Sequence, residues 1–345
     1  MIRKDYLIVG DGFAALFFAF QLIKANKSFL LFSCGVKGAS RVSAGIVNPV
    51  VLKKFTVFDK AQEQLELLKS EFKEMERRWK GKYFIDEPIH RIFHDEKEKA
   101  LWLKKSKEPV LENFLSKEIV FLQGVENPYG CGTVLGSGRI DLEAWFKDAL
   151  GFLEKNGYLV NDSFNYNLLD LKEMKYIDFH FKHVVFAEGI GVKNNPFFED
   201  LPVQSNKGHH IKVELLEERL DEKTIKKKHF LFPLSSNLYY YGGTYDREAF
   251  LSEVDESAKE QLTRGLKEFY TSNFRIESVE FGFRPTVKDR RPLIGAHRKF
   301  KNLYVFNGLG ARGLMNANYY APFLFDHIEK GEALPSEIYY ERFKE

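Results

Sequence analysis

The chain has 345 residues, of which 44% are hydrophobic and 29% charged, a balance that excludes a disordered chain and is typical of a globular protein. At about 100–200 residues per domain, this length predicts two domains. The net charge of +3 is too small to require a nucleic-acid partner, and two cysteines cannot form a disulfide framework. No apolar run approaches the roughly 20 residues that span a bilayer, so a cytoplasmic protein without membrane contact is expected.

The first 33 residues are predicted to form a βαβ unit. Residues 6–9 are a short apolar run, as expected for a strand buried on both faces. Residues 13–23 are almost wholly apolar, as expected for a helix packed on nearly all sides. Residues 29–32 form the next apolar strand.

Three further helices and a loop are predicted before residue 160. Charged and apolar residues alternate at helical spacing over residues 58–79 and 96–107. Asp141 is placed to cap a helix that runs to about residue 156, because its carboxylate can accept from the free amides of the first turn. Residues 124–138 are rich in glycine and are expected to form loops and turns.

The predicted secondary structure changes twice in the second half of the chain, from α/β to antiparallel strands and back. An apolar strand is predicted at residues 183–187, and another at 303–306 is followed by a helix over 315–329. Between them, strand-like segments of an antiparallel region occupy residues 210–215, 230–234, 238–242 and 276–286. Two interleaved domains follow from this order. The first comprises residues 1–55, 136–204 and 285–345, and the second comprises residues 56–135 and 205–284.

A glycine motif joins the first strand to the first helix. It reads Gly10-Asp11-Gly12-Phe13-Ala14-Ala15. Gly10 permits a tight turn, Gly12 lets the backbone approach a pyrophosphate, and Ala15 is small enough for close helix–strand contact. Because the motif lies between a strand and a helix in a βαβ unit, it predicts a dinucleotide site.

The end of the second strand departs from the usual dinucleotide pattern. An acidic residue is expected there to bind the ribose hydroxyls, and this chain has Ser33. A serine binds a ribose less strongly than a carboxylate does. Lys37 and Arg41 follow, so this segment alone leaves an NADP site open.

The C-terminal region carries an ordered series of motifs. They are Phe283 to Thr286, Asp289 to Gly295 and Asn302 to Leu314. This series resembles the C-terminal signature of the D-amino-acid oxidase (DAO) superfamily of FAD-dependent oxidoreductases. Further segments of the resemblance are Ala39-Ser40, Ser43 to Ile46, Gly138 to Asp141, Val184 to Gly189 and Lys207-Gly208. The run from Gly308 to Leu314 is similar to the flavin domain of the enzyme that makes 5-methylaminomethyl-2-thiouridine in tRNA.

The resemblance implies an α/β fold and FAD as cofactor. The expected architecture is a discontinuous Rossmann-like FAD-binding domain with an interleaved α+β substrate domain built on an antiparallel sheet. The residues assigned to FAD are Gly10, Gly12, Phe13, Ala14, Ala15, Ser33, Ser40, Arg41, Ala44, Gly45, Phe164, Ala187, Gly189, Gly308, Gly310, Ala311, Arg312, Gly313 and Leu314.

The same resemblance implies oxidation of a C–N bond in a small amino acid or secondary amine, with hydride transfer to flavin N5. Arg284 matches the family arginine that binds the substrate carboxylate, a task that suits a guanidinium fork; a structural salt bridge is the alternative. Tyr241 or Tyr245 could line the pocket, although core packing is the more frequent use of such residues. No histidine or cysteine spacing predicts a metal site.

Three other functions remain open from the sequence. A flavin oxidase could act on a glycine-type modification of tRNA, which predicts an open basic rim and salt-sensitive tRNA binding. A non-catalytic relative is suggested by Ser33, and an NADP-dependent reductase by Lys37 and Arg41. The sequence does not identify the electron acceptor or the oligomeric state.

Overall fold

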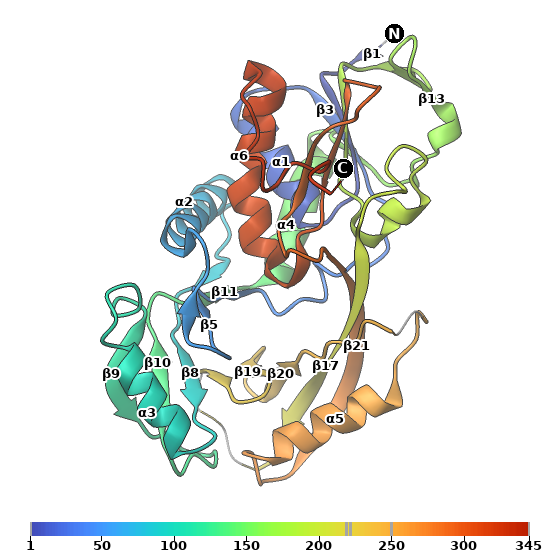
Figure 1. The fold of residues 1–345 in the computed structure, drawn as a ribbon. Coiled ribbons are helices and arrows are strands. Elements are labelled where there is room, and N and C mark those ends of the chain that lie inside the picture. The colour runs from blue at the N-terminus through green and yellow to red at the C-terminus, as the bar shows by residue number, and fades with distance from the viewer. Residues whose placement is uncertain (1, 218–219, 221–222, 249–250, 344–345) are drawn as a thin grey trace.

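The computed structural model describes residues 2–343 except 218–219, 221–222 and 249–250. Two sheets dominate it, and two long strands run from one to the other (Figure 1). Within the described residues, no helix combines the length and the apolar character needed to cross a membrane.

The first sheet has six strands in the order β12-β3-β2-β16-β23-β22. Their bounds are β12 Leu159–Val160, β3 Phe29–Phe32, β2 Tyr6–Val9, β16 His183–Phe186, β23 Leu303–Asn307 and β22 Leu293–Ala296. The first five are parallel, and β22 runs antiparallel to β23. This sheet confirms the expected α/β class, with strands from the start, middle and end of the chain.

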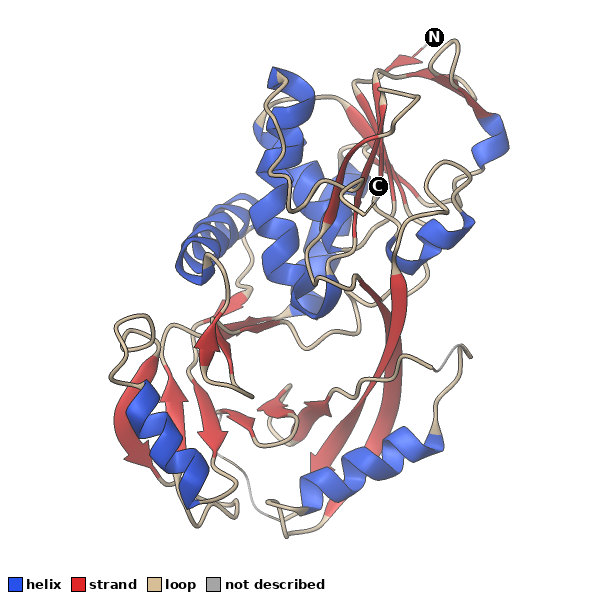
Figure 2. Ribbon diagram, in the orientation of Figure 1, coloured by secondary structure: helices blue, strands red, loops and turns tan. Residues whose placement is uncertain are grey.

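Helices cover one face of this sheet: α1 (Phe13–Lys24), α2 (Ala61–Trp79), α4 (Leu142–Lys155) and α6 (Gly313–Lys330) (Figure 2). Strand alternation directs Tyr6 and Ile8 to this helical side and Leu7 and Val9 to the other side. The other side is covered by β1 (Ile2–Arg3), β13 (Leu169–Asp170), β14 (Lys175–Tyr176) and β15 (Phe179–His180) together with the short helices η1 (Tyr166–Leu168) and η2 (Gly189–Asn194).

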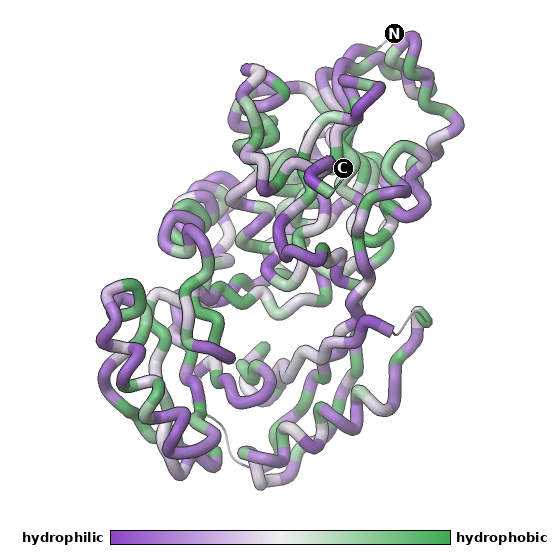
Figure 3. Tube along the Cα trace, in the orientation of Figure 1, coloured by the Kyte–Doolittle hydropathy of each residue, from purple (hydrophilic) through white to green (hydrophobic). Residues whose placement is uncertain are grey.

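The predicted helices are present, and α1 is buried as its composition indicated. Its residues from Phe13 through Leu22 are all buried, and Figure 3 shows hydrophobic stretches, in green, among the elements packed around it. Asp141 caps α4 as predicted, accepting from the Ala144 amide at 3.0 Å. Phe72 of α2 packs against Phe17 of α1 and Trp145 of α4, and the division of the chain into two interleaved domains stays a prediction.

The second sheet has eight strands in the order β21-β17-β20-β19-β18-β8-β10-β9. Their bounds are β21 Phe274–Thr286, β17 Gln204–Leu215, β20 Leu238–Gly242, β19 Phe230–Pro233, β18 Thr224–Lys226, β8 Ile89–Ile92, β10 Cys131–Val134 and β9 Leu115–Val120. Helix α5 (Glu256–Lys267) packs against β17 and β20, and α3 (Glu96–Lys105) packs against β9 and β10. The antiparallel pairs within residues 204–286 agree with the sequence prediction.

Residues 124–138 do not form only loops and turns. They contain β10 and the start of β11 (Gly138–Ile140), and Gly132 of β10 lies against the Trp102 ring, where a side chain would clash. The glycine that suggested a loop therefore serves close packing in a strand. β11 pairs with β4 (Ile46–Val47) and β7 (Phe84–Ile85), and β5 (Val50–Val51) pairs with β6 (Thr56–Val57).

Candidate active site

The carboxyl ends of the parallel strands bring four distant segments to one edge of the first sheet. Gly10 follows β2, Ser33 follows β3, Ala187 follows β16 and Gly308 follows β23. In open α/β sheets, ligands bind outside this edge. Most residues assigned to FAD from the sequence lie here.

The turn after β2 requires its first glycine. Gly10 has φ +115°, and a Cβ there would lie 2.4 Å from the carbonyl oxygen of Ala187. The turn leads into α1, which has no side-chain cap and no acidic residue in its first turn. Ser40 Oγ accepts from the Phe13 amide at 3.1 Å, and the amides of Ala14 and Ala15 have no partner within the helix. This helix end suits a pyrophosphate, which the free amides and the helix dipole both favour.

A second helix begins beside the first. Helix α6 starts at Gly313, also without a side-chain cap or an acid in its first turn, and a Cβ at Gly313 would lie 3.4 Å from the Phe13 ring. The preceding turn, η3 (Gly310–Arg312), contains Gly310 with φ +62° and open space around its Cα. Ala311 and Leu314 lie in the same run. Two uncapped helix N-termini therefore share one region, and this arrangement favours bound negative charge.

The segment from Ser40 to Gly45 passes in front of these helix ends. Gly45 has φ +63°, and a Cβ there would lie 2.4 Å from the Ile140 carbonyl oxygen, so Gly45 allows β11 to approach closely. Ala44 and Gly45 were assigned to FAD from the sequence; their contact with it stays a prediction. Phe164 stacks on Tyr176 at a centroid distance of 4.5 Å and meets Phe32 edge-on, beside the end of β3.

Gly189 follows β16 at the same edge. It has φ +57° and open space around its Cα, and its carbonyl accepts from Asn307 Nδ2 at 2.8 Å. The neighbouring Glu188 is held by Tyr166 and by Asn195, and burial raises its pKa. These bonds fix the backbone of the loop after β16.

Ser33 is not isolated at the end of β3. Its hydroxyl donates to Asp11 Oδ2 at 2.5 Å, and Arg41 forms an ion pair with the same carboxylate. The Arg41 guanidinium also lies 5.5 Å from the centroid of the Phe146 ring. Arg41 is therefore already neutralised by Asp11, which argues against its binding a ribose phosphate.

Arg284 lies on β21, opposite Asn206 of β17. Its Nη1 donates to Asn206 Oδ1 at 3.1 Å and to the Thr244 carbonyl at 3.0 Å, and its guanidinium carbon lies 4.4 Å from the Tyr245 ring centroid. No carboxylate of the described residues forms an ion pair with it. The structural salt bridge considered as the alternative is therefore absent from the part of the chain that the structure describes.

Tyr240, which was not chosen from the sequence, lies close to Arg284. A Cβ built on Gly243 would lie 3.1 Å from Arg284 Nη2 and 3.8 Å from the Tyr240 hydroxyl, so both groups flank Gly243. The Tyr240 ring stacks between His210 and Phe232, with centroid distances of 4.4 and 4.7 Å. Burial raises the pKa of Tyr240 and lowers that of His210 to about 4, so both are neutral near pH 7.

Tyr241 lies on the opposite face of β20. It packs in the core against His229 and Phe269, and its buried hydroxyl has no hydrogen-bond partner among the described residues. The structure therefore brings Tyr240 and Tyr245 together with Arg284, but not Tyr241. Strand alternation predicts that Tyr240 and Tyr241 lie on opposite faces of β20. Which of these two faces lies next to Arg284 depends on how β17 pairs with β20 and β21, and the sequence does not give this pairing.

Arg312 places a second cation near Tyr245. Its guanidinium carbon lies 4.3 Å from the centroid of the Phe58 ring. Burial and the nearby charge of Arg290 lower the pKa of Arg312, while Tyr245 acts in the opposite direction. Arg284 thus contacts the Tyr245 ring directly, and Arg312, which packs on Phe58, adds a second positive charge to its electrostatic surroundings.

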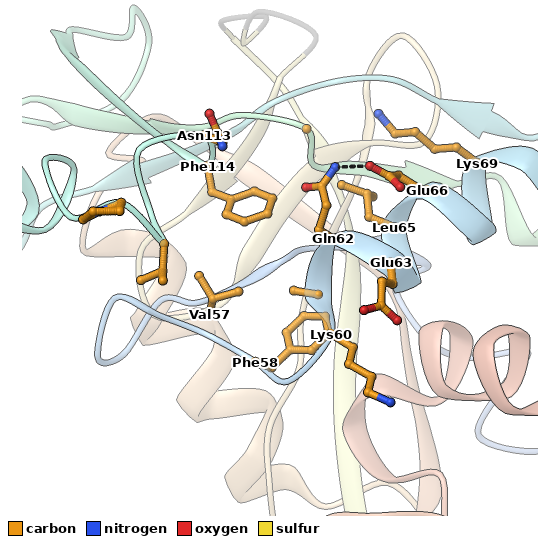
Figure 4. A pocket seen from close by; sticks show the side chains of 14 residues that line it. Val57, Phe58, Lys60, Gln62, Glu63, Leu65, Glu66, Lys69, Asn113 and Phe114 are labelled. Atoms are coloured by element: carbon orange, nitrogen blue, oxygen red, sulfur yellow. Dashed lines mark hydrogen bonds between the residues drawn. The ribbon is translucent and has the colours of Figure 1, made fainter.

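A surface pocket of about 590 Å³ has Phe58 among its lining residues. Figure 4 shows Val57, Phe58 and Leu65 among the side chains around it, with Gln62 hydrogen-bonded to Glu66. A pocket of about 720 Å³ is lined by residues that include Ile190, Gln204 and Phe283. Arg284 lines neither pocket. Within the described residues, no group of three or more His, Cys, Asp or Glu side chains could hold a metal ion.

Comparison with known proteins agrees with this geometry. The family model of the FAD dependent oxidoreductases called DAO matches residues 5–322. The structure is similar to glycine oxidase from Geobacillus kaustophilus, with a TM-score of 0.78 at 18% identity, covering 96% of each chain. It is equally similar to iminodiacetate oxidase (IdaA) from Chelativorans sp. BNC1, with a TM-score of 0.78 at 16% identity over 97% of this chain and 98% of that one.

Two further likenesses were found. L-proline dehydrogenase from P.horikoshii has a TM-score of 0.77 at 12% identity and covers 99% of this chain and 96% of that one. The tRNA 5-methylaminomethyl-2-thiouridine biosynthesis bifunctional protein MnmC of Azoarcus sp. (strain BH72) is 26% identical over 173 residues. That match spans 44% of this chain but only 27% of the length of that protein.

Proposed function

We propose a function from the premise that this chain belongs to the DAO family of FAD-dependent oxidoreductases. The proposed reaction is oxidation of the C–N bond of a small amino acid or secondary amine that carries a carboxylate. Similar structures are named for glycine, iminodiacetate and L-proline. All three compounds combine an amine with a carboxylate on the adjacent carbon.

The residues present fit FAD. Two uncapped helix N-termini face one region, and the glycine turn at Gly10 and Gly12 leaves no side chain between α1 and a pyrophosphate. Bound flavin would supply the acceptor for the hydride that leaves the substrate carbon. Gly310, with open space around it, would let the backbone approach the flavin ring closely.

Arg284 is the observation that carries the proposed substrate class. Its Nη1 is fixed by Asn206 and the Thr244 carbonyl, and no described carboxylate neutralises it. A guanidinium held by neutral acceptors retains its charge and its fork geometry for an incoming carboxylate. The neutral Tyr240 and the ring of Tyr245 would form the adjacent walls.

Protonation of the substrate follows from the same surroundings. His210 and Tyr240 are held neutral by burial, and the carboxylate beside His210, that of Glu280 at 3.8 Å, is itself paired with Lys212 at 2.7 Å, which offsets its charge. Arg284 itself disfavours a second positive charge close by. The substrate amine therefore binds in its neutral form, and no acid–base side chain is assigned.

Matched amine pairs test this function. Each pair contains a compound with a carboxylate and its counterpart without one: glycine and methylamine, sarcosine and dimethylamine, L-proline and pyrrolidine. Product formation by the FAD-loaded protein is expected for at least one carboxylated compound, with kcat/KM about 10–100-fold above that of its counterpart. Equal turnover of both members would contradict the proposed role of Arg284.

A second candidate is a flavin oxidase that acts on a glycine-type modification of tRNA, favoured by the similarity to MnmC. It shares the chemistry but adds a nucleic-acid partner. Binding of tRNA that weakens linearly with the logarithm of salt concentration would support it. Turnover of free amino acids with no measurable tRNA binding would favour the small-molecule substrate.

The cytoplasm is the proposed location. Cys34 and Cys131 are unpaired, as expected for a protein in a reducing compartment. Quantifying free thiols in protein isolated under non-reducing conditions tests this, since a disulfide-linked product would contradict it.

A further inference from the structure

The end of β3 lacks the usual acidic residue but has a carboxylate from another segment beside it. The acid that dinucleotide folds use for the ribose hydroxyls is replaced by Ser33, whose side chain is buried. A carboxylate is nevertheless present, because Asp11 of the preceding turn directs Oδ2 to the Ser33 hydroxyl at 2.5 Å. The sequence pattern places Asp11 at a position between two glycines that has no side-chain role in the usual motif.

We propose that Asp11, held by Ser33 and Arg41, binds the hydroxyls of the adenosine ribose of FAD. The acid has thus moved from the end of β3 to the turn after β2, and Ser33 is the residue that orients it. This proposal rests on FAD binding alone and is independent of which substrate is oxidised.

The contacts of Asp11 leave one oxygen available. Ser33 and Arg41 both bond to Oδ2, and no hydrogen bond from a described residue reaches Oδ1. The Asp11 side chain is 13% exposed, so it is held in place yet accessible to a ligand. A carboxylate oxygen accepts from a hydroxyl more strongly than a serine does.

The surroundings of Asp11 fit an adenosine. Ser33 follows the buried Phe32 directly, and the partly buried Phe164 meets Phe32 edge-on, so Phe164 is the aromatic ring beside this strand end that a base could reach. Arg41 is fixed by Asp11 and by the Phe146 ring. Because Asp11 is a carboxylate, it can accept from ribose hydroxyls, and because it already pairs with Arg41, that cation is not left over for a ribose phosphate.

The competing explanation is that Asp11 only anchors the segment after β3. In that case Asp11 would hold Arg41 and the exposed residues 34–38 in place without touching the ligand. Both explanations predict weaker FAD binding when Asp11 is changed. They differ in whether the loss depends on the ribose hydroxyls of the ligand.

The test measures dissociation constants with FAD-free protein, by quenching of flavin fluorescence. The ligands are FAD and two FAD analogues that lack the 2′- or the 3′-hydroxyl of the adenosine ribose. The wild type is expected to bind FAD about 10–100-fold more tightly than at least one analogue. Equal affinity of the wild type for all three ligands would overturn the proposal without any variant.

Variants then assign the discrimination to Asp11. Asp11→Asn is expected to remove most of the preference for FAD, and the double variant Asp11→Asn with Ser33→Glu is expected to restore part of it. Ser33→Ala, which keeps the carboxylate but removes its orienting hydroxyl, should reduce the preference by a smaller factor. Retention of the full preference in Asp11→Asn, with uniformly weaker binding of all ligands, would establish the anchoring role instead. Because the readout is binding, failure of this proposal leaves the proposed reaction untouched.

Discussion

The guanidinium of Arg284 occupies the space that a side chain at Gly208 would fill. A Cβ built on Gly208 would lie 2.2 Å from both Nη1 and Nη2 of Arg284. Gly208 lies on β17, two residues from Asn206, which binds the same guanidinium. The strand therefore supplies both a hydrogen-bond partner for Arg284 and the space that its guanidinium occupies. This explains why the Lys207-Gly208 motif needs a glycine at its second position.

Gly208→Ala is expected to displace Arg284 and weaken binding of the substrate carboxylate. Arg284 is tied by two hydrogen bonds, so it cannot shift without losing one of them. The predicted outcome is a KM raised about 10-fold or more with FAD affinity unchanged. Steady-state kinetics and flavin titration measure the two quantities.

Gly151→Ala provides the matched control. Gly151 lies in α4 with open space around its Cα, so alanine there should stabilise the helix by about 1 kcal/mol or less and leave KM unchanged. An unaltered KM in Gly208→Ala would mean that Arg284 does not bind the substrate in the position seen here.

Tyr240→Phe and Tyr241→Phe should separate the two faces of β20. The Tyr240 hydroxyl flanks Gly243 together with Arg284, so its removal is expected to lower kcat/KM about 5–30-fold. The Tyr241 hydroxyl is buried without a hydrogen-bond partner in the described part of the chain, so its removal should leave kinetics unchanged and stability equal or slightly higher. A kinetic defect confined to Tyr241→Phe would reverse this assignment.

His229 should make the fold sensitive to acid. Burial lowers its pKa from 6.5 to about 4, and Nδ1 bonds to the Gly243 carbonyl at 3.0 Å. The unfolded chain protonates this histidine below pH 6.5, whereas the folded chain resists until about pH 4, so stability falls as the pH falls through this window. Between about pH 7.5 and about pH 5 the contribution lost is about 2 kcal/mol.

His229→Gln is the variant that isolates this effect. Glutamine keeps a donor for the Gly243 carbonyl but does not titrate. Urea unfolding gives the free energy of unfolding at the two pH values. On going from the higher to the lower pH, this free energy should fall by about 2 kcal/mol less in the variant than in the wild type. Equal losses in both proteins would assign the acid sensitivity to other groups.

Asp141→Ala should destabilise the fold by about 1 kcal/mol without changing FAD affinity. The side chain caps α4 through the Ala144 amide, and α4 packs its Trp145 against α1. Asp141→Asn, which preserves an accepting oxygen, should recover most of the loss. Thermal unfolding of both variants checks the order.

The nucleotide-binding half of the fold was predictable because its signals are local. Buried parallel strands and the enclosed α1 require continuous apolar runs, and Gly10 marks the one turn that β16 crowds. The cap at Asp141 is equally local. The strand β10 was missed because Gly132 lies in it to admit the Trp102 ring, a reason that only the tertiary packing supplies.

The candidate site was predictable in part. Arg284 could be chosen from its motif, but Tyr240 required the register that sets Asn206 opposite Arg284 on neighbouring strands. The role of Asp11 could not be predicted from the sequence, because it depends on how close the turn after β2 lies to the end of β3, where the Asp11 carboxylate meets Ser33. The sequence of one segment alone does not predict which residues of another segment it will contact.

The most direct test of the proposed function is anaerobic reduction of the bound flavin by the substrate. The loss of the flavin's visible absorption measures this reduction. Wild-type protein loaded with FAD should bleach with glycine, sarcosine, iminodiacetate or L-proline. Arg284→Lys, which keeps the charge but loses the fork, should require about 10–100-fold more of the same compound while binding FAD normally. Protein that holds FAD yet bleaches with none of these compounds, or bleaches identically after Arg284→Lys, would contradict the proposed carboxylate anchor and substrate class.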